Sequence, residues 1–159
     1  MSHFIRKPNK QDLTAIEFIL RQWTDEGRVK KYIDKVIKVI SEQRDETAQF
    51  FVATSNEKIV GVAGIDKPSP EILKYSRTNK PVELKIIFID QANVKQGVGG
   101  TLLDFIEKEA QSIGYKEIIL GSAEKYRRTA YKFYLKMKYS ELGIITIAEE
   151  QVQVFSKKI

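Results

Sequence analysis

The sequence predicts an α/β fold with a mixed, mostly antiparallel central sheet of six to seven strands and helices on both faces. Two observations carry this prediction. Runs with strand-type and helix-type periodicity alternate along the chain, and two pairs of strand-type runs are separated by short polar turns. The chain has 159 residues, of which 42% are hydrophobic, so it is long enough to form one domain with a buried core. Helices interspersed in a strand-rich chain pack on the faces of one sheet.

The first half of the chain is expected to hold one short strand, two helices and a hairpin. Pro8 stops the first strand, and apolar residues then recur at helical spacing. The expected elements are a strand at Phe4–Lys7, a helix capped by Asp12 or Thr14, a second helix after a break at Thr24–Gly27, and strands at Gln49–Thr54 and Lys58–Ile65.

The second half begins with a polar segment, Asp66–Pro81, that holds three of the four prolines. It is long for a connection, so it is either a mobile functional loop or additional local structure. The elements expected after it are a strand at Val82–Asp90, a helix from Thr101 to Ser112 ending at Gly114, a strand at Lys116–Gly121, a helix from Lys125 to Lys138, and strands at Leu142–Ala148 and Gln151–Phe155 around a turn at Glu149–Glu150.

Composition excludes several classes of site. The chain has no Cys, which rules out disulfides, thiolate nucleophiles and cysteine zinc sites. Its single His, His3, makes a catalytic triad or a multi-His metal site improbable, so no metal is expected. No apolar run is long enough to cross a membrane, and Met1–Lys10 is too polar for a signal peptide, which together predict a soluble, cytoplasmic protein.

The most chemical feature is a strand, a glycine turn and a helix, built around Gly97, Gly99 and Gly100. Small residues let a ligand approach the backbone, and the first N–H groups of a helix attract an anion. No Lys precedes Thr101 as a Walker loop requires, and Leu102 stands where the dinucleotide fingerprint needs glycine. The alternatives are a different phosphate site and a helix that simply starts at a glycine-rich turn.

Read with its flanks, this segment resembles the GCN5-related N-acetyltransferases (GNAT). That family shows E-L-x-x-L-Y-V on a strand and R-G-x-G-I-G opening a helix, and the chain has Glu83–Ile89 and Val94–Gly99 at the same spacing. The family's A-x-x-F-Y-x-K resembles Ala130–Lys136. The sequence departs from the pattern at four places: Val94 replaces Arg or Gln, Gln91 replaces Pro, Arg127 replaces Asn and Lys138 replaces Gly.

The resemblance implies that residues 1–159 form a single N-acetyltransferase domain with the acyl-CoA N-acyltransferase-like fold and acetyl-CoA as cosubstrate. It places backbone contacts for the acyl group and pantetheine at Phe88 and Ile89 and the pyrophosphate at the glycine turn. Lys95 or Arg127 would compensate for the missing Arg at Val94. The implied cofactor-binding residues are Phe88, Ile89, Val94, Lys95, Gln96, Gly97, Val98, Gly99, Gly100, Thr101 and Arg127.

The implied reaction is direct transfer of the acetyl group to an amine, with Tyr134 as general acid and Glu83 as base, acting through a water. A phenol with a pKa of about 10 can donate a proton to a leaving thiolate. The alternatives are that Tyr134 is a core aromatic on an apolar helix stripe and that Glu83 is a solvated or paired carboxylate.

The acceptor classes that stay open range from polyamines and aminoglycosides to protein N-termini. The resemblance places the acceptor near the first two helices and the last hairpin, where acidic residues either attract a cationic amine or are simply solvated. The segment Asp66–Pro81, with Tyr75 and Arg77, is a candidate wall for this acceptor site. The acidic residues concerned are Asp25, Glu26, Glu149 and Glu150. A homodimer is a family-level expectation, and no membrane partner is expected.

The net charge of +6 is concentrated at Glu124–Lys138, which has six basic residues against one acidic residue. These cations are either the solvated face of a helix or, at Arg127 and Arg128, contacts for coenzyme A phosphates. Two other functions stay open: a non-catalytic acyl-CoA sensor on the same fold, which the loss of Arg at Val94 keeps in play, and a nucleic-acid-binding module. No nucleic-acid-binding signature supports the latter, so no nucleic acid is expected.

Overall fold

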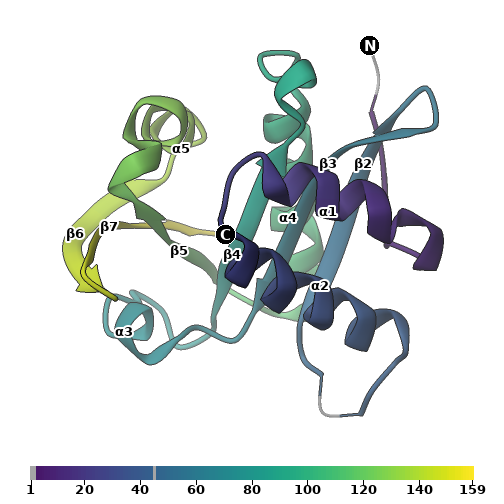
Figure 1. Cartoon of the computed structure of the whole chain (residues 1–159). Coiled ribbons are helices and arrows are strands. Elements are labelled where there is room, and N and C mark those ends of the chain that lie inside the picture. Colours follow the sequence, from purple (N-terminus) through teal and green to yellow (C-terminus); the bar gives the residue numbers. More distant parts are fainter. Residues whose placement is uncertain (1–2, 45) are drawn as a thin grey trace. The chain divides into compact units, whose positions relative to one another are not determined.

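The computed structural model describes residues 3–44 and 46–159, and its elements follow the expected order (Figure 1). The strands of the described chain form a seven-stranded sheet in the order β1-β2-β3-β4-β5-β7-β6. The pairs β1–β2, β2–β3, β5–β7 and β6–β7 are antiparallel, whereas β4–β5 is parallel, so the predicted mixed, mostly antiparallel sheet is confirmed. The strands are β1 (Phe4–Arg6), β2 (Gln49–Ser55), β3 (Lys58–Asp66), β4 (Pro81–Ile89), β5 (Glu117–Ala123), β6 (Ser140–Ile147) and β7 (Glu150–Lys158).

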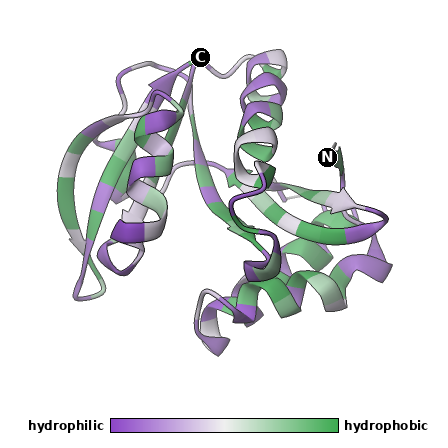
Figure 2. Cartoon of the chain, turned by 90° about the horizontal axis from the view of Figure 1, so that it is seen from above, coloured by the Kyte–Doolittle hydropathy of each residue, from purple (hydrophilic) through white to green (hydrophobic). Residues whose placement is uncertain are grey.

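The α-helices are α1 (Leu13–Arg21), α2 (Glu26–Ile40), α3 (Pro70–Leu73), α4 (Val98–Ile113) and α5 (Lys132–Lys136). The chain forms two compact units, each built from two segments of sequence. The first unit contains Met1–Ile65 and Ile86–Ile106, and the second contains Asp66–Lys85 and Glu107–Ile159. Figure 2 shows hydrophobic and hydrophilic residues alternating along the helices, as expected of helices with one buried face.

In the first unit, strand residues alternate between two helix-covered faces. Phe50 and Val52 on β2 pack into a core cluster with residues of α1 and α2. Phe51, which points the other way, meets Phe105 of α4 edge-on with ring centroids 5.3 Å apart. Because successive strand side chains point to opposite faces, α1 and α2 cover one face of this part of the sheet and α4 covers the other.

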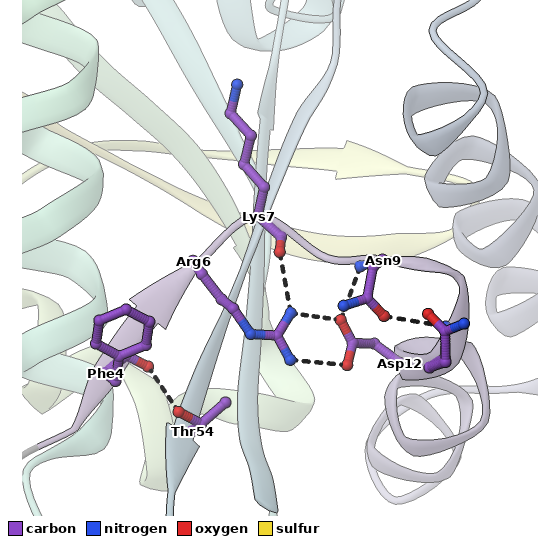
Figure 3. Close-up of polar contacts among 7 residues, drawn as sticks. Phe4, Arg6, Lys7, Asn9, Asp12 and Thr54 are labelled. Carbon is purple, nitrogen blue, oxygen red and sulfur yellow. Dashed lines mark hydrogen bonds and ion pairs between the residues drawn. The ribbon is translucent and has the colours of Figure 1, made fainter. Parts of the chain in front are cut away.

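Of the two cap residues expected for α1, Asp12 does occupy its N-cap position, but its side chain makes no capping hydrogen bond to α1. Asn9 caps a 3₁₀ turn, Lys10–Asp12, that leads into α1, and its Oδ1 accepts from Gln11 N at 3.0 Å. Asp12 completes the cap by accepting from Asn9 N at 2.7 Å and also takes both arms of Arg6, at 2.6 and 2.9 Å (Figure 3). The hydrogen bond from Arg6 lowers the pKa of Asp12 and outweighs the effect of burial.

Two tight hairpins confirm the predicted strand pairs. The β2–β3 turn at Asn56–Glu57 has φ values of 50° and 67°, the primed geometry that matches the twist of paired strands. The β6–β7 turn has the same geometry, but it lies at Ala148–Glu149, one residue before the expected turn. The break expected at Thr24–Gly27 is shorter than predicted, because α2 already begins at Glu26, after its N-cap Asp25.

In the second unit, the segment Asp66–Pro81 is held as local structure around a buried carboxylate. It contains α3, and Glu117 on β5 is completely buried beneath the part that follows. Burial raises the pKa of Glu117, but hydrogen bonds to its charged form outweigh this, so its pKa is lowered. The donors are Ser76 Oγ, Arg77 N, Thr78 N and Oγ1, and Ser156 Oγ.

Arg77 fastens the same segment to β7, because its guanidinium donates to the carbonyl oxygen and hydroxyl of Ser156 at 3.1 Å. Its backbone N–H and its side chain are both engaged. Of the two alternatives for Asp66–Pro81, the structure therefore supports additional local structure.

The described part of the chain lacks two features, a membrane-spanning helix and a cluster of metal-ligating side chains. In residues 3–44 and 46–159, no helix combines the length and the hydrophobicity needed to cross a bilayer. The same residues contain no cluster of three or more His, Cys, Asp or Glu that could hold a metal ion.

Candidate functional site

The glycine turn forms the N-terminus of α4, and the helix starts earlier than expected. Residues 98–100 already belong to its first turn, whereas the sequence suggested a start at Thr101. Gly97 accepts the first helical hydrogen bonds, from Thr101 N at 3.1 Å and from Thr101 Oγ1 at 2.9 Å. Gly97 has φ +81° and Lys95 has φ +65°, so the backbone turns sharply twice just before the helix.

This geometry leaves a set of backbone donors at an open surface. The N–H groups of Val98, Gly99 and Gly100 precede the first residue that can bond within the helix. Gly97 is exposed, and nothing lies within 4 Å of the point where a Cβ would stand. Val98, by contrast, is buried and anchors the turn to the core. The N-terminus of α4 can therefore receive an anion through its backbone.

Val94 and Gln96 precede this turn. Val94 is 39% exposed although it is apolar, and Gln96 is exposed. A side chain at position 94 thus reaches solvent beside the turn, where an Arg would contact an anion but Val cannot.

The end of β4 is tied to the end of α1 by contacts that the sequence did not reveal. Trp23 donates from Nε1 to the carbonyl oxygen of Ile89 at 2.8 Å. Its ring lies nearly parallel to that of Phe88, at 8° and with centroids 6.3 Å apart. Gln22 accepts from Gln91 N at 2.7 Å. In the sequence, Trp23 stands out only as one more apolar residue at helical spacing.

Tyr134 lies on α5 in an aromatic cluster. Its side chain is 6% exposed, and its ring centroid lies 5.2 Å from that of Phe155, 5.3 Å from that of Phe133 and 5.9 Å from that of Tyr139. Within the described residues, its hydroxyl forms no hydrogen bond. Burial raises the pKa of this phenol, so it is protonated throughout the physiological range. The residue is buried, but its hydroxyl is not among the fully buried side-chain atoms that lack a partner, so this protonated donor reaches solvent, where it suits a ligand atom.

The segment before Tyr134 is not the continuous helix that was expected from Lys125 to Lys138. It is a 3₁₀ turn at Glu124–Tyr126, a π-helical turn at Arg127–Tyr131 and then α5. Tyr131 donates to the carbonyl oxygen of Ser122 at 3.0 Å and packs edge-on against Phe155. Because a π turn is wider than an α turn, it changes which residues after it face inward.

Glu83 is buried on β4, and its hydrogen bonds within the described chain all involve one oxygen. Oε1 accepts from Ser69 N at 2.8 Å, from Ser69 Oγ at 3.0 Å and from Lys85 Nζ at 3.0 Å. Within the second unit, the parallel register of β4 and β5 ends at the pair Glu83–Ile119, although β5 continues to Ala123. Glu83 therefore lies where this pairing stops.

The charged residues outside these elements are mostly engaged in local contacts. Arg127 is exposed, with 71% of its side chain in solvent and Glu124 only 3.9 Å away. Asp25 accepts from Arg28 N as the cap of α2, and Glu26 pairs with Arg21 at 2.7 Å. All three of these side chains therefore have partners, and the partner of Arg127 is the exposed Glu124.

The sequence-predicted residues fall into two groups, one in each compact unit. The first unit brings together Phe88, Ile89 and the turn from Val94 to Thr101. The second unit holds Glu83, Arg127 and Tyr134. Residues that sequence reasoning missed are Trp23 and Gln22 beside the first group and Tyr139 beside the second.

Comparisons with known proteins agree on one family. A family model described as acetyltransferase (GNAT) family matches residues 13–139. Among curated proteins, human N-acetyltransferase 8 is 29% identical over 94 residues, which cover 59% of this chain and 39% of the human protein. The chain therefore spans less than half the length of that relative.

Solved structures share the fold at low sequence identity. A GNAT-family acetyltransferase from Desulfovibrio desulfuricans superposes with a TM-score of 0.81 at 16% identity over 99% of both chains. An N-acetyltransferase from Staphylococcus aureus Mu50 has a TM-score of 0.76 at 20% identity over 99% of both. The PaiA N-acetyltransferase from Thermoplasma acidophilum, solved in complex with coenzyme A, has a TM-score of 0.71 at 17% identity over the full length of both.

Proposed function

Because the chain belongs to the GNAT family of acetyltransferases, we propose that it transfers an acetyl group from acetyl-CoA to a primary amine by direct attack in a ternary complex. The observation that carries the proposal is Tyr134: a buried phenol, held protonated, with no hydrogen-bond partner in the described chain. It lies at the position where the family resemblance places the general acid. Its hydroxyl is not among the fully buried side-chain atoms that lack a partner, so it reaches solvent and is open to a ligand, whereas a phenol buried up to its oxygen would need a protein acceptor.

In this reaction the amine nitrogen attacks the thioester carbonyl, a C–N bond forms, and the C–S bond then breaks. The leaving thiolate needs a proton, which Tyr134 supplies. Burial makes the phenol a weaker acid, but the same loss of water raises the basicity of a thiolate leaving beside it. Donation therefore becomes favourable as charge builds on sulfur.

Glu83 is the proposed base. Most alkyl amines are protonated at neutral pH, because the pKa of the corresponding ammonium is about 10.4. The amine must therefore lose a proton before it attacks. Glu83 Oε1 is engaged by Ser69 and Lys85, and we assign the proton to Oε2 through an intervening water. The contacts to Oε1 would then hold the carboxylate in place while Oε2 accepts the proton through the water.

The cosubstrate would be held mainly through backbone groups. The pyrophosphate of acetyl-CoA fits the open N-terminus of α4, and an amide donor is unaffected by the loss of Arg at Val94. Lys95, which is exposed beside the turn, adds positive charge. By the family resemblance, Arg127 would contact a coenzyme A phosphate, and the backbone of Phe88 and Ile89 would supply the oxyanion donor and the pantetheine contacts. Arg127→Ala is expected to raise the Kd for acetyl-CoA several-fold, whereas Lys30→Ala, at an exposed position on α2, leaves it unchanged.

The decisive experiment measures coenzyme A release with a panel of polyamines, aminoglycosides and peptide N-termini. With the best acceptor, Tyr134→Phe is expected to lower kcat about 10²-fold and to leave the acetyl-CoA Kd unchanged. Tyr131→Phe is the matched control, since its hydroxyl is already bonded to Ser122, and it should keep the wild-type kcat.

Failure would take one of two forms. If acetyl-CoA binds but no amine accelerates coenzyme A release, the non-catalytic sensor replaces the proposed enzyme. If transfer occurs but Tyr134→Phe retains full kcat, the proposed acetyltransferase activity is supported and the proposed role of Tyr134 as general acid is refuted.

A further inference from the structure

The helix that carries Tyr134 ends in a capping motif of which Tyr134 is itself a part. Tyr139 N donates to Tyr134 O at 2.9 Å, and Lys138 N donates to Leu135 O at 3.0 Å. Lys138 has φ +75°, the left-handed conformation that this motif requires. These two crossed bonds define a Schellman motif, in which the residue after the left-handed position packs on the first residue of the last turn. Here those two residues are Tyr139 and Tyr134, whose rings meet at 62°.

Tyr139 is in turn held by a charged pair. Its side chain is buried, 3% exposed, and its hydroxyl donates to Glu107 Oε2 at 2.9 Å. Glu107 Oε1 accepts from Lys157 Nζ at 2.8 Å, and the same ammonium lies 5.8 Å from the centre of the Tyr139 ring. Glu107 on α4, Lys157 on β7 and Tyr139 thus form a closed set of three contacts inside the second unit.

We propose that Tyr139, fixed by Glu107 and Lys157, is a positioning residue that holds the Tyr134 phenol in its reactive orientation. The inference rests on the proposed role of Tyr134 as proton donor. Since the Tyr134 hydroxyl has no hydrogen bond of its own in the described chain, only packing sets where it points. Phe133 and Phe155 also touch its ring, but they are apolar and bring no directional bond. Tyr139 contacts Tyr134 through a backbone hydrogen bond and through its ring. The Tyr139 ring is itself fixed by a hydrogen bond to the charged Glu107.

The kinetic test compares variants that remove or retain the hydrogen bond between Tyr139 and Glu107. Tyr139→Phe keeps the ring contact and the backbone bond but loses the bond to Glu107. Glu107→Ala removes the acceptor, and Glu107→Gln retains an oxygen that can accept from Tyr139. We expect a five- to tenfold lower kcat for the first two, an unchanged KM for acetyl-CoA, and recovery of most of the kcat in Glu107→Gln. Lys108→Ala, at an exposed neighbouring position, is the control.

Coupling to Tyr134 separates positioning from general support of the fold. In a Tyr134→Phe background, Tyr139→Phe should cause no further loss of kcat, because the group it positions is already gone. An equal loss of kcat in both backgrounds would overturn the proposal. So would an unchanged kcat in folded Tyr139→Phe and Glu107→Ala.

A second readout does not depend on catalysis. In protein labelled with 3-fluorotyrosine, the ¹⁹F signal of Tyr134 is identified by its disappearance in Tyr134→Phe. We expect it to shift or broaden in Tyr139→Phe and Glu107→Ala and to stay in place in Lys108→Ala. If the wild-type protein acetylates no amine, the proposed function fails while this signal still reports whether Tyr139 orders Tyr134. An unchanged signal in both variants refutes the positioning role itself.

Discussion

Replacing Lys138 with glycine should stabilise the protein. Lys138 is exposed and has φ +75°, a conformation in which an L-side chain is strained by about 1–2 kcal/mol. Glycine removes that strain but loses more backbone entropy on folding, which costs about 0.5–1 kcal/mol. The difference leaves a gain of roughly 0.5–1 kcal/mol in the free energy of unfolding. For a chain of this length, such a gain raises Tm by about 1–4 °C.

The assay is urea unfolding followed by circular dichroism, with a thermal melt as a second measure. Lys136→Gly is the matched control, because the same residue type is replaced two positions earlier, at the last residue of α5. There glycine has no strain to relieve and should cost up to about 1 kcal/mol. The two substitutions are therefore expected to shift the urea midpoint in opposite directions.

A clear result would refute the reasoning. If Lys138→Gly is no more stable than the wild type while Lys136→Gly loses stability as expected, backbone strain does not determine the stability of this helix end. The capping bonds and the ring contact between Tyr134 and Tyr139 would then hold it regardless of which residue occupies the left-handed position.

Three further predictions concern stability. Asp12→Asn should lower the free energy of unfolding by about 1.5–3 kcal/mol at neutral pH, by loss of the charged bonds from Arg6. Because the pKa of Asp12 is lowered in the folded state, this stabilisation is present above its unfolded pKa of about 3.9 and is lost as the pH falls through the folded pKa. Urea titrations should therefore show the difference in free energy of unfolding between variant and wild type shrinking in acid. A difference that stays constant with pH would contradict this. Glu117→Ala should cost about 3 kcal/mol or more, measured by the same unfolding assay, because several buried donors lose their acceptor; a loss below 1 kcal/mol would show that water replaces the carboxylate. Gly64→Ala should cost about 1–3 kcal/mol, since its Cβ would stand 2.5 Å from Cε1 of the buried Phe50 ring; a Tm equal to the wild type would mean that the ring moves aside freely.

The strands and hairpins could be predicted from the sequence because burial imposes a period that is visible in the residues themselves. Phe50 and Phe51 point to opposite faces, and both faces are covered, so β2 appears as a continuous apolar run. The first and last residues of the helices were harder to predict from the sequence. The turn before α1 depends on a side-chain exchange between Asn9 and Asp12, which competes with the plausible cap residues that follow it.

Contacts between distant segments account for what the sequence could not show. Glu117 stands at the start of a strand, where a carboxylate is normally solvated, yet its donors come from residues about 40 positions away on either side. The π turn before α5 coincides with contacts from Tyr131 to Ser122 and Phe155. Helical periodicity cannot predict these contacts, because both partners lie outside the helix. The bond from Trp23 to Ile89 is of the same kind. Periodicity reports which side of an element is buried, but not which atoms it meets.

Under the proposed mechanism, the family pattern is kept where the chemistry needs a side chain and relaxed where the backbone suffices. Val94 replaces an Arg at the glycine turn, yet the donors of α4 that face the turn are amides, which any residue supplies. Lys138 replaces a Gly, yet the capping bonds to Leu135 and Tyr134 still form, at the expense of a strained φ. In the proposed mechanism Tyr134 has no such substitute, because no backbone group can donate a proton to a thiolate. A substitution at Tyr134 should therefore affect turnover far more than the natural replacements at positions 94 and 138 do.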